Sequence, residues 1–260
     1  MKPSHPLFSK GEKIRDAYNK TAEFYNQRYK YIQYVKYGIL LPKLIRIHSS
    51  SNCEILGPIL DLGGGTGLLV EFLQMLSNYL KGHGTDDEKC DLILKFTRFL
   101  LLKQIKKECT SFRPTPVIIC DISFEMLNIA RKNLDRSKQY GLVACDCSHL
   151  PFRDKSFSIA TTFTLFQNVD EIGHAIEELF RIMSNGGTLG ISQLKKQSNN
   201  LKFAGLVSSF FSEITPVHYE DNLAEFQKHI VQLDKYTHFH DLANVEDFFI
   251  IAKKIAGNKK

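Results

Sequence analysis

The chain has 260 residues, 43% of them hydrophobic, which is enough for one large domain with a substantial core. The net charge of +6 is mildly basic and the lysines and arginines are scattered, so an RNA partner is open but not required. The chain has no run of about 18 apolar residues and no hydrophobic signal core near its start, which predicts a cytoplasmic protein without a transmembrane segment.

The six cysteines form no CxxC pair and no cluster with histidine at zinc spacing. The sequence therefore predicts neither a metal site nor a disulfide framework. Cys120 lies in an apolar run and Cys145 in a strand-like one, so both are expected to be buried thiols.

The N-terminal fifth of the chain is expected to be helical. After a polar arm over residues 1–12, a helical pattern rich in tyrosine runs from Ile14 to about Arg46. We expect residues 1–50 to form a helical cover on a domain that spans 51–260. Tyr18 and Tyr25 lie seven residues apart on one face of this helix, which either packs on the domain or closes over a ligand.

Strand and helix patterns alternate from residue 58 onward. Short apolar runs that end in glycine or acidic residues are followed by amphipathic segments, which predicts a mostly parallel sheet with helices on both faces. The predicted strands are 58–63, 117–123, 140–147, 157–166, 188–194, 237–243 and 246–254; the predicted helices between them are 68–80, 124–134, 172–187 and 224–233.

The segment at about 77–116 is longer than a strand–helix–strand connection needs. It contains a basic amphipathic helix over 91–108, with the apolar residues Leu92, Phe96, Phe99 and Leu100 and the lysines Lys103, Lys106 and Lys107. We expect an insertion packed on the domain, and we leave open that this helix contacts a membrane surface or a partner.

Three acidic residues close three successive predicted strands. Asp61, Asp121 and Asp146 follow strands whose carboxyl ends meet at one edge of the sheet, where ligands of such folds bind. A carboxylate after the second strand suits the two hydroxyls of a ribose, and one after the third suits the amine of adenine. These positions predict a ligand that contains adenosine.

The glycine-rich turn between the first strand and its helix indicates the kind of adenosine ligand. Its spacing is G-x-G-x-G, through Gly63, Gly65 and Gly67, whereas a dinucleotide fingerprint would need glycine at Leu68. Asp61 stands two residues before this turn, which disfavours a pyrophosphate and favours a ligand that carries an amine or sulfonium cation.

The stretches ILDLGGGTGLL, VIICDISFEMLNIARKN, LVACDCSHLPFRDKSFSIATTF and ELFRIMSNGGTLGIS resemble the ordered motifs of class I S-adenosylmethionine-dependent methyltransferases, especially the family of the ubiquinone/menaquinone C-methyltransferases. The resemblance implies a Rossmann-like α/β fold with a seven-stranded sheet, order 3-2-1-4-5-7-6, strand 7 antiparallel. It also implies that the cofactor is S-adenosylmethionine, and it implies roles for the residues Asp61, Gly63, Gly65, Thr66, Gly67, Asp121, Ile122, Met126, Asp146, Cys147 and Phe163.

In this resemblance the glycines admit the methionine moiety and the ribose, and Asp61 lies near the amino group. Asp121 binds the ribose, Ile122 and Met126 pack on the adenine, and Asp146 and the backbone N–H of Cys147 meet its polar edge. Phe163 flanks the sulfonium. Simpler roles remain open, such as Asp121 as a helix cap and Met126 as ordinary core.

The sequence does not identify the methyl acceptor or a catalytic base. Methyl transfer from a sulfonium mainly needs alignment, so the absence of an acid–base pair is no objection. The segment after the fourth strand lacks the Asn/Asp-Pro-Pro-aromatic motif of base-methylating enzymes, which favours a small-molecule acceptor over RNA. A binding protein without turnover and a nicotinamide dehydrogenase are the alternatives.

Overall fold

The computed structural model describes residues 10–48, 57–105, 115–134, 140–194, 200–218, 220–229 and 247–255. Seven strands form one sheet in the order β3-β2-β1-β4-β5-β7-β6, and β7 runs antiparallel to both of its neighbours. This confirms the predicted fold and strand order. The strands are β1 (Ile59–Leu62), β2 (Val117–Asp121), β3 (Tyr140–Ala144), β4 (Phe157–Phe163), β5 (Met183–Leu194), β6 (Glu213–Pro216) and β7 (Asp247–Lys253).

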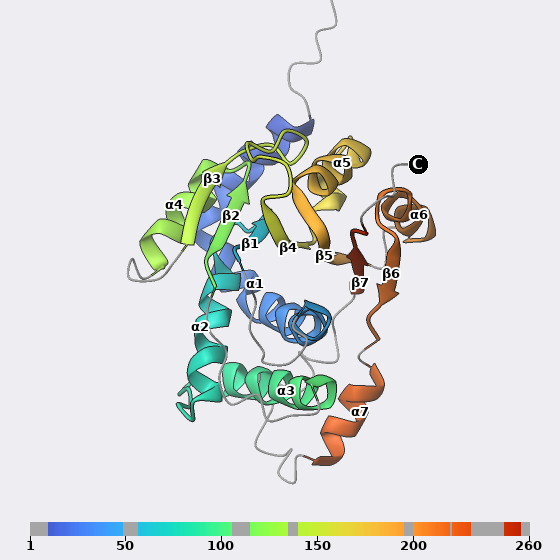
Figure 1. The fold of residues 1–260 in the computed structure, drawn as a ribbon. Helices are drawn as coiled ribbons and strands as arrows, with labels where there is room; N and C mark the ends of the chain where they lie inside the picture. Colours follow the sequence, from blue (N-terminus) through green and yellow to red (C-terminus); the bar gives the residue numbers. More distant parts are fainter. Residues whose placement is uncertain are drawn as a thin grey trace, which may run out of the picture.

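Helices cover both faces of the sheet (Figure 1). Alternate residues of β1 enter different apolar clusters, because successive side chains of a strand point to opposite faces. Ile59 packs with α1, α2 and α4, whereas Leu60 packs with α5 and α6. The described helices are α1 (Lys10–His48), α2 (Leu68–Leu80), α3 (Glu88–Ile105), α4 (Phe124–Asn133), the short η1 (Phe166–Asn168), α5 (Ile172–Ile182), α6 (Asn200–Phe210) and α7 (Glu220–His229).

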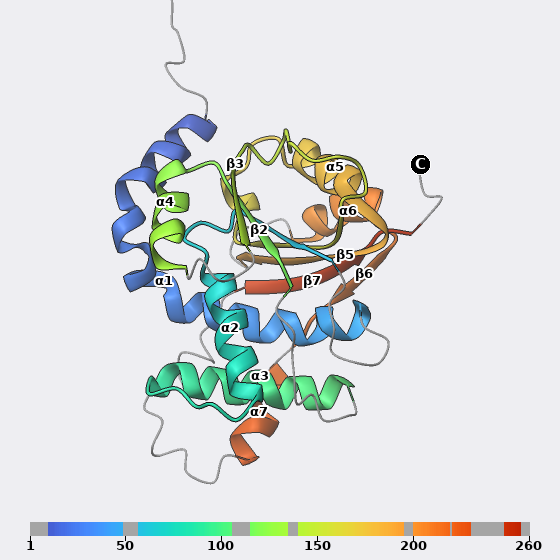
Figure 2. The same cartoon turned by 60° about the vertical axis from the view of Figure 1, so that its left-hand side comes forward.

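Helix α1 has two different environments along its length. In Figure 2 its darker N-terminal part stands beside α4, and its lighter C-terminal part runs beneath the sheet next to α3. Residues of the C-terminal part, including Tyr34, Leu40 and Leu44, are buried in the same cluster as the strands. The domain boundary near residue 50 stays a prediction, since this part of α1 shares the core of the domain.

The inserted helix α3 packs on α1 and α7 rather than facing outward. Leu92, Phe96 and Leu100 are all buried, and the ring of Phe96 lies 5.2 Å from that of Phe226 in α7. Gly38 of α1 permits the close approach, because a Cβ there would lie 2.5 Å from the hydroxyl of Thr97. Leu92, Phe96 and Leu100 are therefore not available to a membrane, whereas a surface contact through the rest of 91–108 stays a prediction.

The C-terminal third differs most from the prediction. The structure contains α6 and β6, which the sequence pattern did not predict. The helix expected at 224–233 overlaps α7, which begins four residues earlier. β7 matches the predicted strand at 246–254, whereas the strand expected at 237–243 lies outside the described residues. No described helix is long and apolar enough to cross a membrane.

A buried ion pair fixes α1 to the carboxyl edge of the sheet. Lys36 Nζ lies 3.0 Å from Asp247 Oδ2 at the start of β7, and both side chains are at most 5% exposed. The hydroxyl of Ser192 on β5 donates to the same carboxylate oxygen. Desolvation makes each charge costly alone, so the partners depend on one another.

We expect Lys36→Met to lower the free energy of unfolding by about 3–5 kcal/mol, because it leaves Asp247 charged and buried without its cation. The double variant Lys36→Met/Asp247→Asn removes both charges and keeps an acceptor for Ser192, so it should recover much of that loss. Urea denaturation of the three proteins measures both effects. A double variant as unstable as Lys36→Met would contradict the ion-pair account.

Candidate functional site

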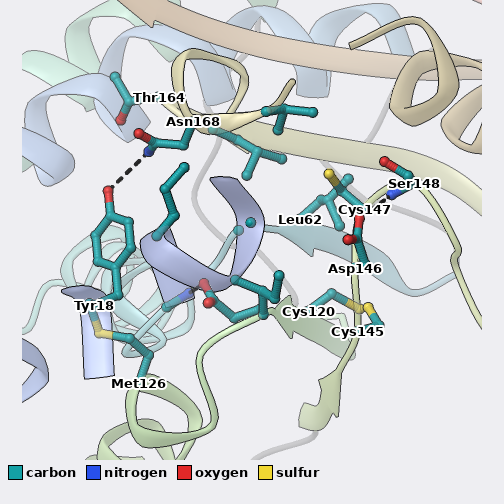
Figure 3. A pocket seen from close by; sticks show the side chains of 18 of the residues that line it. Tyr18, Leu62, Cys120, Met126, Cys145, Asp146, Cys147, Ser148, Thr164 and Asn168 are labelled. Carbon is teal, nitrogen blue, oxygen red and sulfur yellow. Dashed lines mark hydrogen bonds between the residues drawn. The ribbon is translucent and has the colours of Figure 1, made fainter. Parts of the chain in front are cut away.

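A cavity of about 250 Å³ opens at the carboxyl ends of β1, β2, β3 and β4. Figure 3 shows Tyr18 and Asn168 on one side of it and Asp146, Cys147 and Ser148 on the opposite side. Eight of the eleven residues proposed as cofactor contacts line this cavity: Gly63, Gly65, Asp121, Ile122, Met126, Asp146, Cys147 and Phe163. The structure therefore brings together residues that lie up to a hundred positions apart in the sequence.

The turn after β1 has a backbone that only glycine adopts readily. Gly63, Gly65 and Gly67 have φ angles of +76°, +53° and +80°. At Gly64 the restriction is space, because a Cβ would lie 2.5 Å from Asp61 Oδ2 and 2.8 Å from Ile119. The turn thus presents bare backbone to the cavity and leads directly into the N-terminus of α2.

Asp121 ends β2 and anchors this turn. Its Oδ2 accepts a hydrogen bond from Gly65 N at 3.0 Å, and its Oδ1 accepts from Ser123 N at 2.8 Å. Burial raises the pKa of Asp121 to about 6, although the backbone donors oppose the shift. Ser123 is the N-cap of α4, with Oγ accepting from Met126 N, so the structure does not use Asp121 as that cap.

Asp146 follows β3 in a loop that α5 holds in place. Its Oδ1 accepts from Ser148 N at 2.8 Å. Farther along the loop, the guanidinium of Arg181 donates to the carbonyl oxygens of Leu150 and Phe152. The salt bridge to Glu178 at 2.7 Å orients that guanidinium. The loop carrying Asp146 is therefore fixed against the domain, which makes Asp146 a preorganised acceptor at the cavity rim.

Asp61 lies behind the glycine turn instead of in the main cavity. It is 2% exposed, and its only described hydrogen bond is that which Oδ1 accepts from Thr161 at 3.1 Å. Desolvation raises its pKa to about 7, the Thr161 bond lowers it, and the charge of Asp121 raises it further. Thr66 also faces away from the main cavity, and Gly67 is the N-cap of α2.

The N-terminal half of α1 roofs the cavity and is hydrogen-bonded to three of the loops around it. Asn168 after β4 donates to the hydroxyl of Tyr18 at 3.1 Å. Asn19 accepts from Ser123 after β2, at 2.6 Å, and Asn26 accepts from Thr66 after β1. Tyr18 and Tyr25 both line the cavity, so the tyrosine face of this helix points toward the site.

The segment after β4 completes the wall. Thr164 has φ of +54°, a strained backbone for a β-branched residue, and its N–H bonds to the carbonyl of Ser192 at 2.8 Å. Sequence reasoning did not assign several lining residues: Gly11, Ile14, Leu62, Cys120, Cys145, Ser148, Leu165, Val169, Asp170 and Glu171. The rule that strand ends carry the site could have found Leu62 and Cys145, but nothing in the pattern marks the strain at Thr164.

The described residues offer no metal site and place no described histidine side chain in the cavity. No group of three or more His, Cys, Asp or Glu side chains among them is arranged to hold a metal ion. The described His149 and His218 do not line the cavity. His238 and His240 lie outside the described residues, as does the side chain of His229. The geometry supports binding and alignment more than proton transfer.

Comparison with known families matches residues 101–191 to a model described as "Methyltransferase domain". Human 2-methoxy-6-polyprenyl-1,4-benzoquinol methylase is 30% identical over 165 residues, covering 61% of this chain and 49% of that protein. Demethylmenaquinone methyltransferase of Thermobifida fusca is 36% identical over 83 residues, or 31% of this chain and 35% of that protein. Part of the chain is therefore similar to methyltransferase domains. The chain spans about half the length of the curated relatives it matches most strongly.

Solved structures share the fold of this chain. Phosphoethanolamine N-methyltransferase 2 of Haemonchus contortus aligns with a TM-score of 0.56 and 14% identity over 98% of this chain and 62% of that one. A methyltransferase in complex with the Haloferax volcanii Trm112 activator aligns with a TM-score of 0.55 and 15% identity. The alignment covers 97% of this chain and 100% of that one. The [4+2]-cyclase SpnF aligns with a TM-score of 0.51 and 14% identity over 98% of this chain and 100% of that one. The same fold therefore also serves a different reaction.

The raised pKa of Asp61 predicts how the stability of the ligand-free domain depends on pH. The folded state keeps this proton up to about pH 7, whereas the unfolded chain loses it near 3.8. The unfolded state then binds fewer protons between these values, so stability falls as the pH rises. Relative to Asp61→Asn, the wild type should lose stability from pH 4 to 7 and then level off. Thermal melts of both proteins measure this, and a difference independent of pH would contradict the burial of an ionisable Asp61.

Proposed function

We propose that the chain is an S-adenosylmethionine-dependent methyltransferase whose acceptor is a small, uncharged molecule. The observation that carries the proposal is the convergence of the glycine turn, Asp121 and Asp146 on one cavity. A backbone nest, a carboxylate for a diol and a carboxylate for an exocyclic amine together match the parts of an adenosyl amino acid.

Each residue has a defined part in the proposed complex. The remaining lone pairs of Asp121 accept from the two ribose hydroxyls, beside the backbone N–H bonds that its oxygens already receive. Ile122 and Met126 pack on the adenine, and Asp146 and the N–H of Cys147 meet its polar edge. Gly63 and Gly65 let the backbone approach the methionine moiety, while Thr66 and Gly67 hold the turn in place.

A carboxylate oxygen without a hydrogen-bond partner, behind the glycine turn, is a second observation that supports this cofactor. Asp61 Oδ2 is buried without a partner among the described residues, so the free protein lacks a donor that a cationic amine would supply. S-adenosylmethionine supplies an activated methyl group when bound. This chain's residues would orient that group toward the acceptor, with Phe163 beside it and α1 excluding water.

The acceptor end of the cavity disfavours an anionic acceptor. Lining residues there include the apolar Ile14, Leu165 and Val169 and the acidic Asp170 and Glu171, and none of the described lining residues is lysine, arginine or histidine. A phosphate or carboxylate would therefore enter without a counter-charge. The relatives named as benzoquinol methylases favour an uncharged small molecule. A cytoplasmic location stays a prediction from the sequence.

Replacement of Asp121 tests the ribose contact. Hydrogen bonds to charged groups contribute roughly 1.5–3 kcal/mol, so Asp121→Ala should weaken S-adenosylhomocysteine binding by about ten- to a hundredfold. Glu125→Ala is the matched control, because it removes an exposed carboxylate four residues away. Calorimetry of both variants measures the affinities. Unchanged affinity in Asp121→Ala would place the ribose elsewhere.

The function itself is tested in two steps. S-adenosylhomocysteine should bind the folded protein by calorimetry, and a methyl-labelled cofactor should then transfer its label to an uncharged phenol or quinol acceptor. Transfer of the label to added RNA would show that the acceptor is RNA and not a small molecule. Binding with no transfer to any acceptor would favour the binding protein without turnover. Failure to bind would refute the proposal, and NADH binding in its place would revive the dehydrogenase.

A further inference from the structure

A second, much smaller cavity lies directly behind the main one. Its volume is about 10 Å³, enough for a single water molecule or an ammonium group. The two cavities share the residues Tyr25, Gly63 and Phe163, so these three form the partition between them. The small cavity is therefore a pocket behind the wall that would face the methionine moiety of the cofactor.

Two buried acceptors belong to residues that line this small cavity. Asp61 on β1 and Gln33 on α1 both line it and are 2% and 6% exposed. Asp61 Oδ2 and Gln33 Oε1 have no hydrogen-bond partner among the described residues. Gln33 Nε2 donates to the hydroxyl of Tyr25 at 3.2 Å, and in this amide orientation Oε1 is the atom without a described partner.

Unpaired buried acceptors are uncommon, and two around one small space call for a donor group. No lysine or arginine is among the described residues that line this cavity, and the α1 lysines Lys36 and Lys30 are paired with Asp247 and Glu71. A group with several N–H or O–H donors fits both acceptors, and the carboxylate favours a positive charge. A ligand that reaches the partition, or a water in the small cavity, can supply such a donor.

We propose that Gln33 is a cofactor-positioning residue: its Oε1 and Asp61 Oδ2 together accept hydrogen bonds from the α-ammonium group of the cofactor, directly or through the one water molecule that the small cavity holds. This rests on the proposed function, since it requires an adenosyl amino acid in the main cavity. Helix α1 then recognises the amino-acid end of the cofactor, and the adenosine end is recognised separately by Asp121 and Asp146.

A comparison of two ligands distinguishes a cofactor-positioning role of Gln33 from a purely structural role. S-adenosylhomocysteine carries the α-ammonium group, whereas 5′-methylthioadenosine keeps the adenosine and sulfur but lacks the amino-acid part. Gln33→Met should weaken binding of the former about tenfold and change that of the latter less than twofold. Gln74→Met is the matched control, because it replaces a half-buried glutamine of α2 that lines neither cavity.

Calorimetry with both ligands distinguishes the outcomes. Equal weakening of both ligands, or no weakening of either, would overturn the role of Gln33 while leaving the proposed function intact. A wild type that binds neither ligand would refute the proposed function itself. Gln33→Asn keeps the amide but shortens its reach, so it gives the same selective loss if Gln33→Met does not fold, and a loss common to both ligands in Gln33→Asn would again overturn the role.

Discussion

The burial of helix α1 is the constraint on which the site depends. Leu40 and Leu44 are inserted between the sheet and α3, and the Lys36–Asp247 pair attaches the same part of the helix to β7. The chain continues from this anchored part into the N-terminal part of the same helix, which covers the carboxyl edge of the sheet (Figure 2). The roof over the cavity is thus an extension of the core, and the loops after β1, β2 and β4 need only short polar contacts to hold it.

The same packing explains why the carboxylates of the site are poorly solvated in the ligand-free state. Asp61 and Asp121 lie under α1 and the glycine turn, and desolvation raises the pKa of both. A ligand with hydroxyls and an ammonium group would supply the donors that water supplies elsewhere. Such a site discriminates well, because a ligand lacking these donors leaves buried polar atoms unpaired. Pre-formed acceptors around a mostly apolar cavity fit a reaction that depends on alignment.

Much of the central fold was predictable because its signals are local. β1, β2 and the helices after them are short apolar or amphipathic segments that end in glycine or aspartate, so their bounds and the convergence of Asp121 and Asp146 follow from chain order. β6 was missed because a four-residue edge strand carries almost no pattern. Gln33 was missed because the sequence places it in a polar, tyrosine-rich helix, and only tertiary packing buries it. The covered face of α3 likewise depends on α7, far along the chain.

Hydrogen–deuterium exchange with and without S-adenosylhomocysteine tests the central claim most directly, namely that one adenosyl ligand binds between the strand ends and α1. The account predicts that bound ligand slows exchange together in 11–27, 61–68, 121–127 and 145–149, while α3 and α7 change little. Slower exchange in the glycine turn without any change in 11–27 would contradict the role of α1 as the roof. Unchanged exchange in 61–68 and 121–127 would contradict the placement of the ligand itself.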